Sequence, residues 1–329
     1  MLYRTRSRRA LRLTRGRVVG TALAALFVLV VSVSPAGAAL ARATDGATQA
    51  ASHELTAWKA AVLGFVEGVT EYLPISSTGH LHVTQRLLDV GATDATEDAA
   101  DTYAITIQGG AILAVLLLYR RRLATMVSGL LGRDEPGRRV LLAVVVAVIP
   151  AVVTAVLFEQ SIKDNLLGVG PIVGAWIAGG LLILWLAPRL RELGSRGIPL
   201  DEITPRHAAI IGIAQILALW PGTSRSLVTI VAGVFLGLSL AAAVEFSFLL
   251  GFVTLAGATA YETLKNGNNL IDTYGIVNPL IGFVVAFVAA AVAIRWMVTY
   301  LQRHDLSIFG WYRLAIAALT LVLLATGAI

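Results

Sequence analysis

The sequence contains no cysteine and few charged residues. Charged side chains make up 14% of the 329 residues, and aromatic ones make up 7%. The lack of cysteine excludes disulfides, thiolate metal sites and a cysteine nucleophile. Soluble domains carry about 25% charged residues, whereas this chain is 57% hydrophobic and has a mean hydropathy of +0.78. The composition therefore argues against a soluble globular protein.

The hydrophobic residues are gathered in long runs that are nearly free of charge. Each run is close to the roughly 20 residues that a helix needs to cross the hydrocarbon core of a bilayer. We therefore expect an all-α polytopic membrane protein with about six full transmembrane helices, rather than the two soluble domains that length alone suggests. The runs are Tyr103–Tyr119, Val140–Phe158, Pro171–Ala187, Ala241–Leu264, Ile276–Met297 and Ile308–Thr326.

The net charge is +6, and arginines cluster in the short segments between these runs. A basic soluble protein would suggest nucleic acid as a partner. Here the arginines mark cytoplasmic loops, so we expect a lipid bilayer as the surroundings and no nucleic acid. The three arginine-rich segments span residues 120–139, 189–206 and 295–303, and this count places the C-terminus outside.

The first 55 residues form a separate, arginine-rich extension. An apolar run, Val18–Val33, follows the arginines and leads into a small-residue stretch, Pro35–Ala41. This pattern fits a cleavable signal peptide or an uncleaved anchor helix, followed by a polar linker. Residues 56–329 then form the membrane-embedded domain.

Two further apolar segments are interrupted. Trp58–Val90 is broken by Pro74, and Ala208–Leu236 is broken by Pro221 and Gly222. The charge count requires each segment to begin and end on one side of the membrane. We therefore predict two re-entrant helix pairs that enter from opposite faces, with the breaks surrounded by protein or by a water-filled cavity.

Each half of the domain thus contains one re-entrant pair and three spans, over about residues 56–187 and 206–329. A weak internal match supports this inverted-topology repeat. Gly64-Phe-Val-Glu67 aligns with Gly212-Ile-Ala-Gln215, and Ile75-Ser-Ser-Thr78 aligns with Thr223-Ser-Arg-Ser226 at the same offset. Such repeats place a binding site near the bilayer midplane, and helix ends there favour an anionic ligand. Transporters and intramembrane enzymes share this geometry.

The first break carries two acidic residues, Glu67 and Glu71, one helical turn apart. Two like charges in an apolar stretch are costly unless a cation or a shared proton relieves them. Carboxylates together with substrate phosphate suit Mg²⁺ or Ca²⁺. We therefore expect Glu67 and Glu71 to bind a divalent cation.

Hydroxyl groups and a histidine follow these acids. Ser76, Ser77, Thr78 and His80 offer a nucleophile and a base. A plainer explanation exists for each residue taken alone, because hydroxyl groups at breaks in membrane helices often satisfy freed carbonyls. His80 could equally be a hydrogen-bonding residue at the helix end.

The second break suits the binding of phosphate. Gly222 permits a close approach of the backbone, and Thr223, Ser224 and Ser226 can donate to phosphate oxygens. Arg225 stays charged and can bind two oxygens at once, although it could also merely mark the inside face. The two breaks together indicate a phosphoryl-transfer site with a metal and charge neutralisation.

Both breaks resemble the motifs of the undecaprenyl-pyrophosphate phosphatase family, also called bacitracin-resistance proteins. The stretch from Glu67 to His80 matches the first motif throughout, and Pro221–Ser226 matches the second. Lesser matches are Gln108–Val115 and Glu245–Leu250, and the resemblance covers about residues 56–329. The family usually has glycine where this chain has Leu227, and the long N-terminal extension is unusual for it.

The resemblance implies a hydrolase that removes the terminal phosphate of undecaprenyl diphosphate with a divalent cation. In cells this regenerates the lipid carrier for peptidoglycan synthesis, and extra enzyme confers bacitracin resistance. The active site would face the outer side of the plasma membrane. The sequence does not decide between a monomer and a homodimer.

The resemblance also implies roles for individual residues. Glu67 and Glu71 would be the essential acidic pair, and Ser77, His80 and Arg225 would take part in catalysis. We ourselves expect Glu71 to be catalytic as well as metal-binding, Ser77 to be the nucleophile and His80 the base. His80 as the nucleophile, or direct attack by water, stays open. The rival function is a transporter or flippase of prenyl phosphates or small anions.

The absence of cysteine makes the topology directly testable. We expect Ile329→Cys to react with an impermeant thiol reagent added outside intact cells and Arg196→Cys to stay unlabelled, because the charge count places these positions on opposite sides. The opposite labelling pattern would contradict the inverted-repeat topology.

Overall fold

The computed structural model describes residues 54–329, so the interpretation of the N-terminal extension lies outside the described residues. Within residues 54–329 the chain is helical and forms no β-strand, with one isolated bridge between Ile198 and Leu238. Six helices in this range are long and apolar enough to cross a membrane, as predicted from the hydrophobic runs. They are α5 (Asp94–Leu118), α7 (Glu135–Leu166), α8 (Val169–Ser195), α11 (Leu240–Tyr274), α12 (Val277–Leu301) and α13 (Ser307–Ala325).

Shorter helices lie between these spans. The two predicted interrupted segments are α3 (Ala57–Thr70) with α4 (Ser77–Leu87), and α9 (Pro205–Gln215) with α10 (Arg225–Phe235). A short amphipathic helix, α6 (Arg120–Leu130), follows α5, and 3-10 helices cover Leu200–Glu202 and Ile216–Leu219.

Proline and glycine explain why both pairs are interrupted. Pro74 has no backbone N–H and disfavours helical geometry in the residue before it, so α3 stops ahead of it. In the second pair Gly222 has a φ of +95°, which a residue with a Cβ rarely adopts. That both pairs re-enter the membrane without crossing it stays a prediction.

The helix boundaries repeat at a fixed interval. Helix α9 begins 148 residues after α3 (205 − 57), and α10 begins and ends 148 residues after α4 (225 − 77 and 235 − 87). The residues before α4 and α10, Ser76 and Ser224, have nearly the same unusual backbone, with φ of 74° and 78°. The weak sequence match at this same offset therefore corresponds to a structural repeat.

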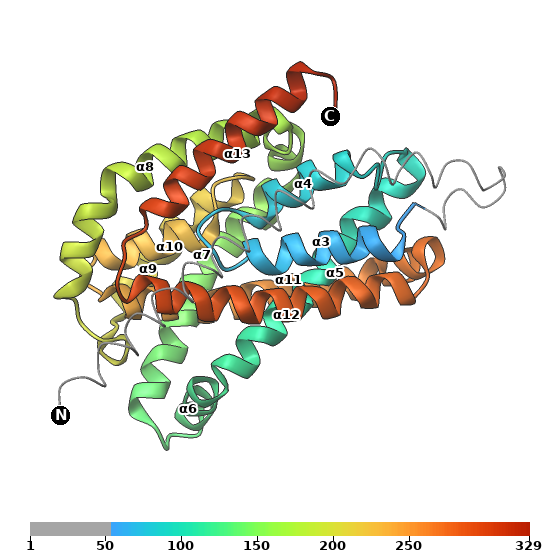
Figure 1. The fold of residues 1–329 in the computed structure, drawn as a ribbon. Coiled ribbons are helices and arrows are strands. Elements are labelled where there is room, and N and C mark those ends of the chain that lie inside the picture. Colours follow the sequence, from blue (N-terminus) through green and yellow to red (C-terminus); the bar gives the residue numbers. More distant parts are fainter. Residues whose placement is uncertain (1–53) are drawn as a thin grey trace, which may run out of the picture.

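The two halves are packed into each other. Helix α3 lies along α12 of the second half, and α9 lies along α7 of the first (Figure 1). A Cβ on Gly64 would sit 2.2 Å from the Gly282 carbonyl oxygen, and one on Gly212 would sit 2.5 Å from that of Ala147. Gly64 and Gly212 occupy equivalent positions in the repeat, and each lets its helix pack closely on a helix of the other half. Each interrupted pair is therefore held by the opposite half.

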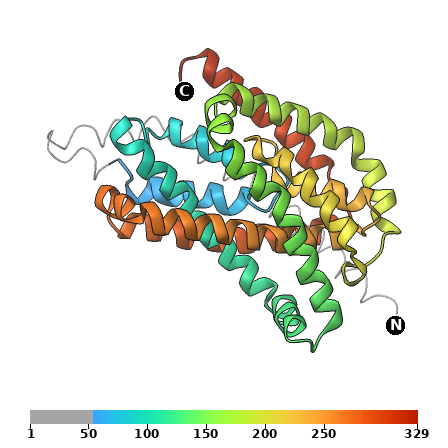
Figure 2. The same cartoon turned by 180° about the vertical axis from the view of Figure 1, so that it is seen from behind.

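The third spans of the halves, α8 and α13, lie side by side in both views (Figures 1 and 2). They run antiparallel, because Gly310 packs on Leu184 while Leu314, one turn later, packs on Gly180. An inverted repeat requires this arrangement, since the second half must run in the opposite direction.

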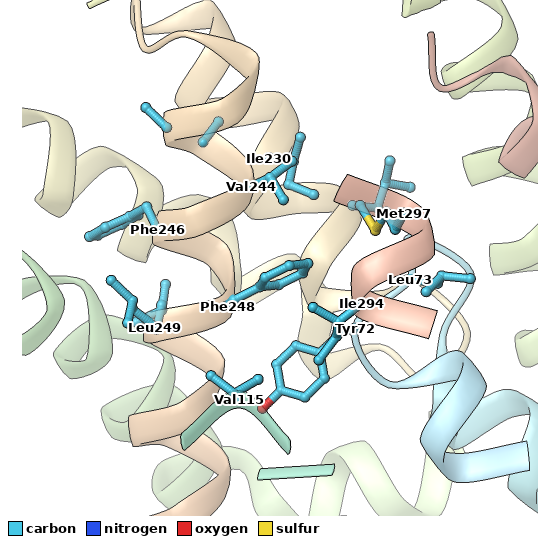
Figure 3. Close-up of a cluster of buried hydrophobic side chains, with 14 of the residues drawn as sticks. Tyr72, Leu73, Val115, Ile230, Val244, Phe246, Phe248, Leu249, Ile294 and Met297 are labelled. Carbon is cyan, nitrogen blue, oxygen red and sulfur yellow. The ribbon is translucent and has the colours of Figure 1, made fainter. Parts of the chain in front are cut away.

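A hydrophobic cluster from both halves lies behind the first break. Tyr72 packs edge-to-face on Phe248 of α11 with 5.3 Å between ring centroids, and Val115 and Ile294 also belong to the cluster (Figure 3). The cluster anchors the chain immediately after Glu71, and this fixes the position of that carboxylate.

Candidate active site

The acidic pair lies at the end of α3. The backbone N–H of Glu71 donates to the Glu67 carbonyl at 2.9 Å, so the helical turn continues and both carboxylates share one face. Glu71 is buried, and its Oε1 lies 3.0 Å from Nη2 of Arg225. Its Oε2 accepts a hydrogen bond from the hydroxyl of Ser77. One carboxylate therefore joins the hydroxyl of the first half to the guanidinium of the second.

Arg225 is the first residue of α10 and reaches across the repeat interface. Its Nη1 donates to the Ser247 carbonyl at 2.9 Å, and its guanidinium lies 5.5 Å from the centre of the Tyr72 ring. A Cβ on Gly251 would sit 1.8 Å from Nη1, so this glycine leaves the room that the guanidinium occupies. The Glu71 carboxylate, the Ser247 carbonyl and the Tyr72 ring therefore hold the guanidinium in place.

These groups open onto a cavity of about 170 Å³. Of the residues predicted as a site, six line it: Glu71, Ser76, Ser77, Thr78, Ser224 and Arg225. The other lining residues are Gln108, Ala151, Gln215, Ala218, Leu219, Trp220, Pro221, Thr254 and Leu255. The lining thus combines polar side chains with apolar ones.

His80 lies outside the lining of this cavity. Its Nδ1 is 2.6 Å from the Ser76 carbonyl oxygen, and its Nε2 is 2.9 Å from the Tyr312 hydroxyl. The ring packs against Trp176 and stacks on Tyr312. The Ser77 hydroxyl donates to Glu71, so Glu71 is the nearest base for Ser77. His80 instead stabilises the backbone of the first break through the Ser76 carbonyl.

The remaining predicted phosphate ligands are engaged in holding the second break. The carbonyls of Gly222 and Thr223 accept hydrogen bonds from Arg313. The Ser226 hydroxyl donates to the Leu73 carbonyl at 2.8 Å, which ties the second break to the first. Leu227, where glycine is usual, is buried in the main hydrophobic cluster and leaves α10 intact.

Glu67 is fully buried beside Glu71, and its carboxylate oxygens receive no hydrogen bond from an N–H or hydroxyl donor among the described residues. No group of three or more histidine, aspartate or glutamate side chains gathers as a metal site in residues 54–329. A cation on Glu67 and Glu71 would therefore need further ligands from phosphate, hydroxyl groups or water. Mg²⁺ and Ca²⁺ accept such oxygen ligands, so the donor set fits either ion.

The sequence analysis did not single out Arg313, which is fully buried in α13. Its guanidinium donates to five carbonyls, at distances of 2.7 to 3.4 Å. The acceptors are Pro74, Ala175, Trp176, Gly222 and Thr223. The sequence did contain a signal for this role, because Arg313 is a lone arginine inside the apolar run Ile308–Thr326. Charged residues in a membrane span are costly unless they are paired.

A second cavity, of about 720 Å³, contains none of the predicted site residues. Its lining includes Arg120, Arg121, Arg122, Arg295 and Glu245. Arg122 pairs with Glu245 at 2.7 Å and with Asp201 at 2.6 Å. These arginines belong to the segments predicted to be cytoplasmic loops, so we assign the chemistry to the smaller cavity.

The helices and the smaller cavity define a multi-pass helical membrane protein whose buried site combines carboxylates, hydroxyl groups and one arginine. Comparison with known families is consistent with this class. The chain belongs to the bacitracin resistance protein BacA family, whose model matches residues 60–319. The family resemblance seen in the two motifs is therefore confirmed.

Curated relatives cover most of the chain. An undecaprenyl-diphosphatase from Sorangium cellulosum is 44% identical over 264 residues, which is 80% of this chain and 84% of that protein. Undecaprenyl-diphosphatase 2 from Rhodospirillum rubrum is 46% identical over 82% of this chain and 94% of its own length. Undecaprenyl-diphosphatase 1 from Paraburkholderia xenovorans is 44% identical over 84% and 98%, respectively.

We expect Arg313→Met to lower the free energy of unfolding by about 3 kcal/mol or more, because several buried carbonyls would lose their donor. Arg313→Lys should recover only part of the loss, since an ammonium cannot reach five acceptors. Thermal unfolding in detergent measures both variants. Arg295→Met, at an exposed arginine, is the matched control, and an equal effect of both Met substitutions would contradict the assignment.

Proposed function

We propose that this protein hydrolyses undecaprenyl diphosphate to undecaprenyl phosphate and inorganic phosphate. The observation that carries the proposal is the contact of Glu71 with both Ser77 and Arg225 at the wall of a buried cavity. Membership of the BacA family and relatives named undecaprenyl-diphosphatase support the substrate. The reaction returns the lipid carrier to peptidoglycan synthesis and confers bacitracin resistance.

The reaction breaks the phosphoanhydride bond. In our mechanism the Ser77 oxygen attacks the terminal phosphorus, its proton passes to Glu71, and undecaprenyl phosphate leaves. Water then attacks the phosphoserine: its oxygen leaves in inorganic phosphate, one of its protons restores the serine hydroxyl, and the proton held by Glu71 is released to solvent. Direct attack by water, with Glu71 as the base, gives the same products and stays open. The alternative of His80 as the nucleophile has no support in its position, because His80 lies outside the cavity lining and both of its ring nitrogens have partners. Arg225 stabilises the charge that develops on the transferred group.

A divalent cation completes this proposal. Glu67 and Glu71 would hold Mg²⁺ or Ca²⁺, which would neutralise negative charge on the diphosphate. The placement of Glu67 beside Glu71 supports a cation, because two neighbouring buried carboxylates are costly when both are ionised. The hydroxyl groups at the cavity wall, Ser76, Thr78 and Ser224, would donate to phosphate oxygens.

The prenyl chain would leave the cavity along its apolar lining residues, among which Trp220 is 44% exposed. We place the protein in the bacterial plasma membrane, with the cavity open to the outer side. The exposed leucines and valines of α7 support contact with lipid. A homodimer stays a prediction.

The first test is phosphate release from purified protein supplied with a prenyl diphosphate. We expect release to stop after exhaustive chelation and to return with Mg²⁺ or Ca²⁺. Glu71→Gln should lower kcat by about 10²- to 10⁴-fold and cost more than Glu67→Gln, because Glu71 also holds Ser77 and Arg225. Full activity after chelation would refute the cation, and no release under any condition would refute the phosphatase.

Arg225→Lys separates catalysis from simple anion binding, the function of the rival transporter. A lysine presents one point charge, whereas the guanidinium can follow two phosphate oxygens as charge shifts. We expect a loss of kcat of roughly a hundred- to a thousandfold, or about 3–4 kcal/mol, with a smaller rise in KM. Steady-state kinetics with thermal unfolding as a check of folding measure this. A normal kcat with only a raised KM would make Arg225 a docking residue.

A further inference from the structure

The second cavity, of about 720 Å³, is lined by four arginines that two separate helices supply, and we call it the arginine cavity. Arg120, Arg121 and Arg122 occupy the first turn of α6, and Arg295 lies on α12. Arg120, Arg121 and Arg295 are exposed, and their guanidinium groups have no hydrogen bond or ion pair with another described residue. No protein partner therefore keeps these three side chains from turning toward a ligand in the cavity.

The lining also contains an acidic residue, Glu245, whose charge is already compensated. Arg122 donates from Nε to Glu245 at 2.7 Å and from Nη1 to Asp201 at 2.6 Å. The other three arginines are left in excess, and like charges that share one cavity repel each other. A bound anion would relieve this repulsion.

The start of α6 adds to the positive charge of the arginine cavity. A helix N-terminus carries a partial positive charge and is usually stabilised by acidic residues or capping side chains. The first turn of α6 contains no acidic residue, and Tyr119 before it provides no side-chain cap. Three arginines occupy this turn instead, so an anion in the cavity would offset both the charge of the helix end and that of the side chains.

The arginine cavity borders exposed apolar surface. Leu117, a lining residue at the end of span α5, is 51% exposed. Val127 and Leu130 of α6, and Leu131 after it, are also exposed, and α6 projects from the helix bundle beside α7 in both views (Figures 1 and 2). Arginines next to exposed apolar side chains are typical of a helix that lies in the membrane interface. The anion that suits this place therefore carries acyl chains.

We propose that the arginine cavity binds the phosphate headgroup of an anionic phospholipid. Basic pockets between membrane helices on the cytoplasmic side bind such headgroups, and the four arginines belong to segments predicted to be cytoplasmic. Arg120, Arg121 and Arg295 donate to the phosphate oxygens, because a guanidinium can bind two oxygens at once. The site shares no lining residue with the smaller cavity, so it goes beyond the proposed function and does not depend on it.

The test compares the wild-type protein with the variant Arg120→Gln/Arg121→Gln/Arg295→Gln in neutral detergent. Each protein is titrated with dioleoyl phosphatidylglycerol, and the rise in Tm with lipid concentration gives an apparent Kd. Each arginine near a headgroup contributes about fivefold in affinity, so the triple variant should bind on the order of 100-fold more weakly. Without lipid the two proteins should have the same Tm, because the three side chains have no protein partner to lose.

The matched control is Arg191→Gln/Arg196→Gln/Arg206→Gln. It removes the same charge from exposed arginines of another predicted cytoplasmic segment, outside the lining of the cavity, and should keep the wild-type Kd. Dioleoyl phosphatidylcholine, which has the same acyl chains and no net charge, should raise Tm far less. Inorganic phosphate at the same concentrations should leave Tm unchanged, because it has no acyl chains to bind beside Leu117.

Four results would overturn the proposal. Phosphatidylglycerol that leaves the wild-type Tm unchanged would mean that there is no site. Equal weakening in both triple variants would mean general attraction to a basic surface. Inorganic phosphate as effective as the lipid would mean a site for a soluble anion, and phosphatidylcholine as effective would mean contact through acyl chains alone. If the triple variant has a lowered Tm without lipid, Arg295→Gln alone, with an expected loss of about fivefold, makes the same comparison.

Discussion

The hydrogen bonds of one buried guanidinium, that of Arg313, hold both helix breaks together. Carbonyls freed by a break inside a bilayer find no water, so each must be satisfied by protein. Arginine offers five N–H donors in a fixed plane, and Arg313 gives bonds to the first break, the second break and α8. Because both breaks are tied to one point, the residues that follow them, Ser77 and Arg225, reach the same cavity.

The repeat supplies matching backbones, and the side chains make the site asymmetric. Ser76 and Ser224 share a rare φ, yet the residues after them are a serine hydroxyl and a guanidinium. Glu67 likewise corresponds to Gln215 (215 − 67 = 148). A symmetric site would contain four carboxylates or two arginines in a small buried volume, and like charges there repel strongly. Divergence of the halves keeps the acids on one side and the anion donors on the other.

Much of the fold and part of the site could be predicted from local patterns. The six spans follow from run length and hydropathy, and the breaks follow from Pro74 and Pro221-Gly222. The two breaks were predicted to form one site together, and Glu71 and Arg225 form an ion pair between them. The partners of His80 could not be predicted, because Tyr312 lies 232 residues further along the chain.

The sequence by itself determined the membrane class, the number of spans and the family, because hydrophobic length and motif spacing are properties of contiguous residues. The tertiary structure decided which polar groups meet. It brought Ser77 to Glu71 and placed His80 behind the break. It also buried the amide of Gln215 without a hydrogen-bond partner among the described residues. These outcomes depend on how α3 packs against α12 and α9 against α7. Such contacts join residues far apart in the chain and are set by the packing of both halves together.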